Sequence, residues 1–131
     1  MFQSRHISIR IQKSAEDVYA FAWKPESFPK WAAGLGSTLT RAGGQWIAQG
    51  PDGDVKVRFS PQNDYGVLDH WVTLPDGTEL YIPLRVFANG EGAEVVLSLY
   101  RPPNRYDDAA FERDAAMVGR DLAKLKALVE A

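Results

Sequence analysis

A histidine stands among aliphatic residues in the stretch GVLDHWVTLPDG, residues 66–77. Successive side chains of a β-strand point to opposite faces, so His70 shares a face with Leu68, Val72 and Leu74. That face belongs in a core or a cavity wall. An imidazole there could bind a ligand's carbonyl or phenol oxygen, or act as a general base near neutral pH. The structural alternative is a ring that bonds a backbone carbonyl or a water.

Asp69 lies on the opposite face by the same alternation. Arg85 falls on the outward phase of the strand expected next along the chain. We expect the two to form an exposed cross-strand ion pair, which contributes only ~0–1 kcal/mol. A strand register shifted by one residue would instead bury the acid and its partner.

Large side chains are the other candidates for a pocket wall, and tryptophan and tyrosine add one polar atom each. Core packing requires the same residue types, so the sequence leaves both roles open for each of them. With His70, the predicted ligand-binding residues are Trp31, Trp46, Phe59, Ile82, Tyr100 and Met117.

Several kinds of chemistry lack the residues that they need. The 131 residues include no cysteine, and the two histidines, His6 and His70, fall on dissimilar phases of distant strands. We therefore expect no metal and no cofactor. The Gly34-Leu35-Gly36 segment lacks the third glycine of a nucleotide-binding loop, and no G-x-S-x-G nucleophile motif is present.

The overall composition narrows the choice of partners. A net charge of −2 without a basic stripe argues against nucleic acid. No apolar run approaches the ~20 residues that span a bilayer, and the N-terminus lacks the features of a signal peptide. We expect a cytoplasmic protein without a membrane span.

Hydrophobic periodicity and turn residues predict the elements that position these side chains. Residues 4–11 alternate as a half-buried strand. Ser14 and Asp17 have the spacing of a helix N-cap, and Pro25 ends that helix. A short second helix over residues 25–35 is then broken by two glycines.

Five turn signals divide residues 37–101 into six short strands, which are joined as hairpins and so are antiparallel. A long helix over residues 107–130 closes the chain, with Asp114 and Asp121 expected on its solvated face. Its apolar stripe comprises Phe111, Ala115, Val118, Leu122, Leu125 and Val129.

The predicted fold is therefore α+β, with one domain over residues 1–131. A seven-stranded curved antiparallel sheet wraps around the long C-terminal helix, in the order β-α-α-β-β-β-β-β-β-α.

This order resembles the START-like or SRPBCC superfamily, also called the Bet v 1-like helix-grip fold, which includes proteins labelled polyketide cyclases or dehydrases. The resemblance covers nearly the whole chain. It is carried by the first strand followed by SAEDVY (14–19), by the segment from Pro25 to Trp31, and by DLAKLK (121–126). It implies a cavity between sheet and helix, which that family commonly uses for lipids, polyketides, hormones or other apolar molecules. The fold also hosts enzymes, so it does not fix the function.

Three functions fit these expectations. The first is a small domain that binds an apolar or aromatic small molecule in the cavity. The second is a polyketide cyclase- or dehydratase-like enzyme with His70 as its acid–base group, which needs at least two converging polar groups. The third is a protein-interaction domain with a filled core, which an exposed apolar patch would mark. Few polar residues fall on the inward phases, which favours binding. The sequence leaves open the ligand, any reaction and the oligomeric state.

Overall fold

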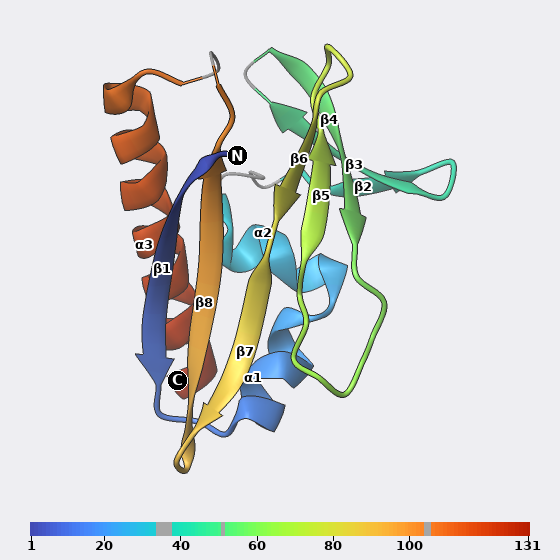
Figure 1. Ribbon diagram of the computed structural model, residues 1–131. Helices are drawn as coiled ribbons and strands as arrows, with labels where there is room; N and C mark the ends of the chain where they lie inside the picture. Colours follow the sequence, from blue (N-terminus) through green and yellow to red (C-terminus); the bar gives the residue numbers. More distant parts are fainter. Residues whose placement is uncertain (34–37, 51, 104–105) are drawn as a thin grey trace.

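The computed structural model describes residues 1–131 except 34–37, 51 and 104–105. Antiparallel strands lie against a long C-terminal helix, and two short helices close one end (Figure 1). The predicted α+β helix-grip arrangement is confirmed. In chain order the elements are β1 (Gln3–Ile11), α1 (Ala15–Ala22), a 3-10 turn (Pro25–Ser27), α2 (Phe28–Trp31), β2 (Thr40–Ala42), β3 (Gln45–Gly50), β4 (Gly53–Phe59), β5 (His70–Thr73), β6 (Glu79–Ile82), β7 (Leu84–Asn89), β8 (Gly92–Arg101) and α3 (Asp108–Glu130).

The strand count differs from the prediction because one expected strand is broken at Pro83. Proline has no N–H to donate to a ladder, so β6 and β7 pair with different partners on either side of it. The result is two sheets, with strand orders β1-β8-β7 and β2-β3-β4-β5-β6.

The two sheets remain joined beside Pro83. The Leu68 N–H donates to the Leu84 carbonyl at 2.8 Å, and the Val86 N–H donates to the Gly66 carbonyl at 2.9 Å. The segment before β5 therefore pairs with β7, whereas β5 itself pairs with β6.

On the other side of Pro83, β6 and the C-terminal half of β8 separate (Figure 1). The described residues show no backbone pairing between these two stretches. We call this gap, between residues 79–82 and 98–101, the seam. It interrupts what would otherwise be one continuous sheet.

The helices begin where the sequence predicts. Ser14 caps α1, because its Oγ accepts from the Asp17 N–H at 3.1 Å. Asp107 caps α3 in the same way through the Ala110 N–H, at 2.7 Å. The expected break of the second helix at Gly34 and Gly36 lies outside the described residues.

One face of α3 packs on the concave side of the sheet. Phe111, Ala115, Leu122 and Leu125 are buried there. Within the part of the chain that the structure describes, no helix is long and apolar enough to cross a membrane.

Candidate functional site

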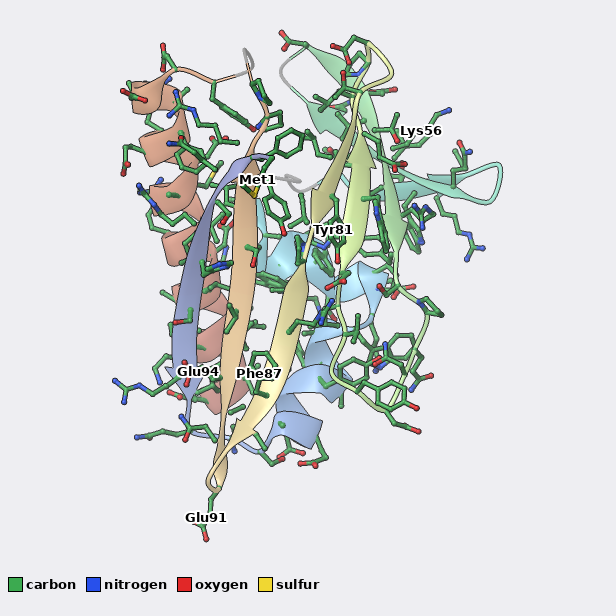
Figure 2. All side chains as sticks on the ribbon, viewed as in Figure 1. Met1, Lys56, Tyr81, Phe87, Glu91 and Glu94 are labelled. Carbon is green, nitrogen blue, oxygen red and sulfur yellow. The ribbon has the colours of Figure 1, made fainter. Side chains whose placement is uncertain are left out.

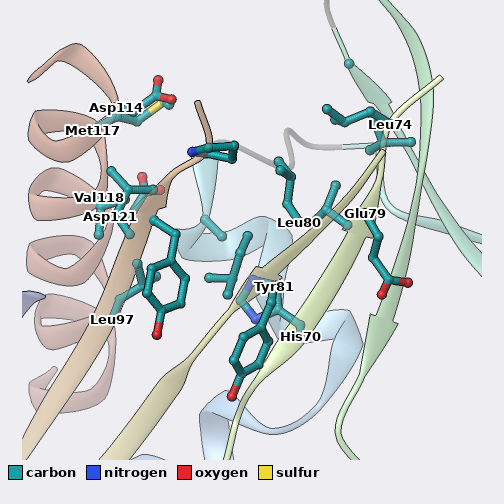
Figure 3. Close-up of a pocket in the computed structure, with 18 of the residues that line it drawn as sticks. His70, Leu74, Glu79, Leu80, Tyr81, Leu97, Asp114, Met117, Val118 and Asp121 are labelled. Carbon is teal, nitrogen blue, oxygen red and sulfur yellow. The ribbon is translucent and has the colours of Figure 1, made fainter. Parts of the chain in front are cut away.

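A cavity of about 560 Å³ lies between the sheet and α3 and extends to the seam. Its size is in the range of small-molecule sites. Most of its wall is aliphatic or aromatic, and Figure 3 shows how β6, β8 and α3 surround it. The lining includes Phe2, Phe28, Trp31, Ala32, Val55, His70, Val72, Leu74, Glu79, Leu80, Tyr81, Ile82, Leu97, Leu99, Tyr100, Pro102, Tyr106, Asp114, Met117, Val118, Asp121 and Leu122.

His70 reaches into this cavity from the first position of β5 (Figure 3). It is 5% exposed, and its Nδ1 lies 3.2 Å from the Leu68 carbonyl oxygen. A carbonyl only accepts, so Nδ1 carries a proton, and in the neutral imidazole Nε2 is then unprotonated. Burial lowers the pKa of His70 to about 4, although the Leu68 carbonyl and the nearby Asp69 carboxylate oppose the change. The imidazole is therefore neutral at pH 7.

Aromatic rings hold the imidazole in place. The Phe28 ring lies edge-on to it, with centroids 5.2 Å apart, and the Phe59 ring lies at 6.1 Å. Phe28 also packs against Trp31 at 5.0 Å. The indole Nε1 of Trp31 is enclosed without a hydrogen-bond partner among the described residues, and such a donor costs about 1–3 kcal/mol.

Asp69, the residue before His70, is also 5% exposed. Its carboxylate accepts from Arg85 Nε at 2.8 Å and Nη2 at 2.7 Å, from the Tyr81 hydroxyl at 2.7 Å, and from the Leu84 N–H at 2.9 Å. Burial alone would raise the pKa of Asp69, but these hydrogen bonds lower it to about 2. The carboxylate is ionised at neutral pH.

The Asp69–Arg85 pair was predicted, but its exposed setting was wrong. Asp69 lies between Val67, which pairs with β7, and His70, which pairs with β6. Its position is therefore beside the break at Pro83. The buried N–H of Leu84, the first residue after that break, donates to the carboxylate. The acid is buried although the strand register is the expected one.

Comparison with known proteins identifies the fold but no family. No protein-family model matches the chain, and no curated protein is similar to it in sequence. Many solved structures do match. An uncharacterised protein from Bacillus thuringiensis superposes with a TM-score of 0.75 at 17% identity, covering 98% of this chain and 100% of that one. For Ara h 8.0201 the TM-score is 0.66 at 9% identity, and the match covers 98% of each chain. The chain has the Bet v 1-like helix-grip fold.

A third match comes from a biosynthetic setting. DynU16, described as a protein in the dynemicin biosynthetic locus, superposes with a TM-score of 0.69 at 13% identity. The match covers 98% of this chain and 47% of DynU16. At such low identities the likeness shows the helix-grip fold alone.

Five of the seven predicted site residues line the cavity of this helix-grip fold, namely His70, Trp31, Ile82, Tyr100 and Met117. The other two, Trp46 and Phe59, are not among the described lining residues. Phe59 lies behind Phe28, with ring centroids 4.7 Å apart, and Trp46 packs edge-on against Phe59 at 6.3 Å. They support the wall from the sheet side.

Two acidic residues of α3 also line the cavity, which corrects their expected solvated position. Asp114 and Asp121 are half-buried and follow the helical spacing of Met117 and Val118 (Figure 3). Spacings of three, four and seven residues put side chains on one helical face. Their spacing from Met117 indicates that they share its helical face, but their charge favoured a position in solvent.

The seam gives the cavity an aromatic border. Tyr81 on β6 and Tyr100 on β8 have ring centroids 6.3 Å apart, and Phe2 packs edge-on against Tyr100 at 6.5 Å. Met1 and Tyr81 lie on either side of the seam in Figure 2. The alternation of strand 79–82 predicts Tyr81 outside, and 40% of it is exposed. It nevertheless borders the cavity because its strand edge is unpaired.

Proposed function

We propose that this protein binds an apolar or aromatic small molecule in the cavity between the sheet and α3. The observation that carries the proposal is the cavity itself, about 560 Å³ with a wall that is mostly aliphatic and aromatic. Sites for small molecules typically combine such a wall with a few polar groups that orient the ligand. His70 is one such group, because it is the buried histidine of the wall.

The second candidate is a cyclase- or dehydratase-like enzyme, and the position of His70 in the cavity wall favours it. Two observations weigh against it. A histidine with a pKa near 4 holds almost no proton to donate at neutral pH, and it is a weak base. The neighbouring Asp69 is bound by Arg85 and Tyr81. Binding therefore remains the primary proposal.

The third candidate, an interaction domain with a filled core, conflicts with a cavity of this volume. A filled core would leave few voids larger than a water molecule.

Native mass spectrometry of the freshly purified protein tests the proposal. We expect a discrete mass excess over the same sample after denaturation. The matched variants are Met117→Trp, which fills the cavity from α3, and Ala116→Trp, which places the same side chain on the exposed face of that helix. The excess should disappear in the first variant and persist in the second, with unchanged circular dichroism in both.

A bare mass in the wild-type protein, or an excess that survives Met117→Trp, would count against a ligand in this cavity. Either result would favour the third candidate function, a protein-interaction domain.

A further inference from the structure

The protonation of His70 restricts what a ligand can offer it. The Leu68 carbonyl holds the proton on Nδ1, so the nitrogen that remains is an acceptor. A group that only accepts hydrogen bonds, such as a ketone, an ether or an ionised carboxylate, therefore has nothing to donate to it. The partner of Nε2 must carry an O–H or N–H.

The Nε2 atom of His70 is also accessible from the cavity. The hydrogen bonds of the described residues include none to Nε2 of His70. Among those residues, the one fully enclosed polar side-chain atom without a partner is Nε1 of Trp31. Nε2 of His70 is therefore not enclosed by protein, and His70 lines the cavity.

The surroundings of His70 specify the rest of the ligand. Phe28 and Phe59 flank the imidazole, and Ile82 is its cross-strand neighbour on β6. Phe28 and Ile82 also line the cavity. A donor group at this depth must therefore be carried on an apolar body, and it must be neutral, because an unpaired charge is costly among such residues.

We propose that the cavity binds apolar or aromatic molecules that bear a hydroxyl group, a phenol or an alcohol, and that this hydroxyl donates a hydrogen bond to Nε2 of His70. The inference rests on the proposed function and names the ligand class of the same site. His70 acts in it as an acceptor that discriminates between ligands of similar shape.

The test uses 2-naphthol and 2-methylnaphthalene, which have the same ring system and differ by a hydroxyl in place of a methyl. Isothermal titration calorimetry at pH 7.5 gives the ratio of their affinities for the wild-type protein and for His70→Leu. One hydrogen bond contributes about 0.5–1.5 kcal/mol. We therefore expect the preference for 2-naphthol to fall by about 2- to 13-fold in the variant, with 2-methylnaphthalene bound as before or more tightly. The matched control, His6→Gln, removes an exposed imidazole and should leave the ratio unchanged.

The outcomes separate the two proposals. If both probes bind the wild-type protein and His70→Leu leaves their ratio unchanged, the cavity binds apolar molecules and the hydroxyl inference is wrong. If neither probe binds the wild-type protein, the proposed function fails together with the inference.

A second measurement does not require the variant to fold. The ¹⁵N shifts of the imidazole nitrogens in the wild-type protein should show Nδ1 protonated and Nε2 unprotonated. Addition of 2-naphthol should move the Nε2 resonance more than addition of 2-methylnaphthalene. A protonated Nε2, or equal responses to the two probes, would overturn the inference.

Discussion

Asp69 and His70 are adjacent in the chain and equally buried, yet their surroundings hold them in opposite charge states. Three donors keep the Asp69 carboxylate ionised, whereas apolar rings keep the His70 imidazole neutral. Burial raises the pKa of an acid and lowers that of a base, and only specific partners can reverse it. Asp69 has such partners, from Arg85, Tyr81 and Leu84.

The neutral imidazole makes stability depend on pH. The pKa of His70 is about 4 in the folded protein and 6.5 for the unperturbed group. Between these values the unfolded chain binds a proton that the folded protein does not, so stability falls as the pH falls. We expect His70 alone to lower the free energy of unfolding by about 2 kcal/mol between pH 7 and pH 5. Urea denaturation at both pH values measures this difference.

The same pair of measurements on His70→Leu isolates the histidine. The variant should lose most of this pH dependence, and His6→Gln should retain it. An unchanged pH dependence in His70→Leu would mean that His70 is protonated in the folded protein.

Removal of the Asp69 carboxylate should be costly for a different reason. Asp69→Ala leaves the fully buried Leu84 N–H without its acceptor, and it frees Arg85 and Tyr81. We expect a loss of about 2–3 kcal/mol in the free energy of unfolding, because Arg85 is partly solvated and recovers some hydration. Thermal or urea denaturation checks the value.

Glu79→Ala is the control for this change. Glu79 pairs with Arg58 at 3.9 Å on the surface, and both side chains are largely exposed. Exposed pairs contribute little, so a loss below about 1 kcal/mol is expected. Equal losses in the two variants would show that the Asp69 cluster is no stronger than a surface pair.

At the scale of single residues, the sequence predicts part of the site. The inward position of His70 follows from the alternation of residues 68–74, and the structure shows it. The burial of Asp69 does not follow, because it depends on a break in the neighbouring strand at Pro83. The alternation of residues within one strand cannot reveal a break in the neighbouring strand with which it pairs.

At the scale of elements, Gly66 controls the approach to β5. Its φ is +71°, and a Cβ there would lie 2.3 Å from the Val86 carbonyl oxygen, in a segment where Val86 also donates to Gly66. We expect Gly66→Ala to separate this segment from β7 and to destabilise the fold by more than 2 kcal/mol, about twice the cost of a left-handed backbone alone. The altered strand would also displace His70.

Gly43 supplies a matched control for this variant. Its φ is +58°, but a Cβ would meet no atom within 4 Å. Gly43→Ala should therefore cost about 1–2 kcal/mol, which is the left-handed penalty without a clash. Denaturation midpoints of the two variants give the comparison, and similar midpoints would show that the contact with Val86 adjusts freely.

Most elements could be predicted from the sequence because their signals are local. Ser14 and Asp107 cap helices at the expected places, and the long helix follows its apolar stripe. The break in strand 79–86 was missed although Pro83 marks it, since alternation continues across the proline from Ile82 to Leu84. The inward position of Asp114 was not predicted, because a charged side chain on a helix is expected to face solvent.

For the whole molecule, the order of elements predicts the helix-grip architecture, and structural matches with 9–17% identity confirm it. The open cavity could not be predicted, because its volume depends on how closely side chains from distant segments of the chain approach one another. Trp46 and Phe59 illustrate this point. Their sequence signal equals that of Trp31, yet they lie behind the wall.

The seam has a consequence for backbone amide hydrogens. Leu74 donates to the Thr78 carbonyl, so by alternation the N–H groups of Leu80 and Ile82 face β5 and that of Tyr81 faces the seam. Ser98 donates to Pro83 across the junction, which places the N–H of Tyr100 on the same side of β8.

The Tyr81 and Tyr100 amides should therefore exchange with deuterated water at least about 100-fold faster than that of Leu80, although all three lie within strands. Hydrogen exchange followed by NMR reads each position separately. Equal protection at Tyr81 and Leu80 would mean that β6 and β8 join in solution and close the sheet over the cavity. Slow exchange that develops only with 2-naphthol bound would identify the seam as the part of the sheet that the ligand orders.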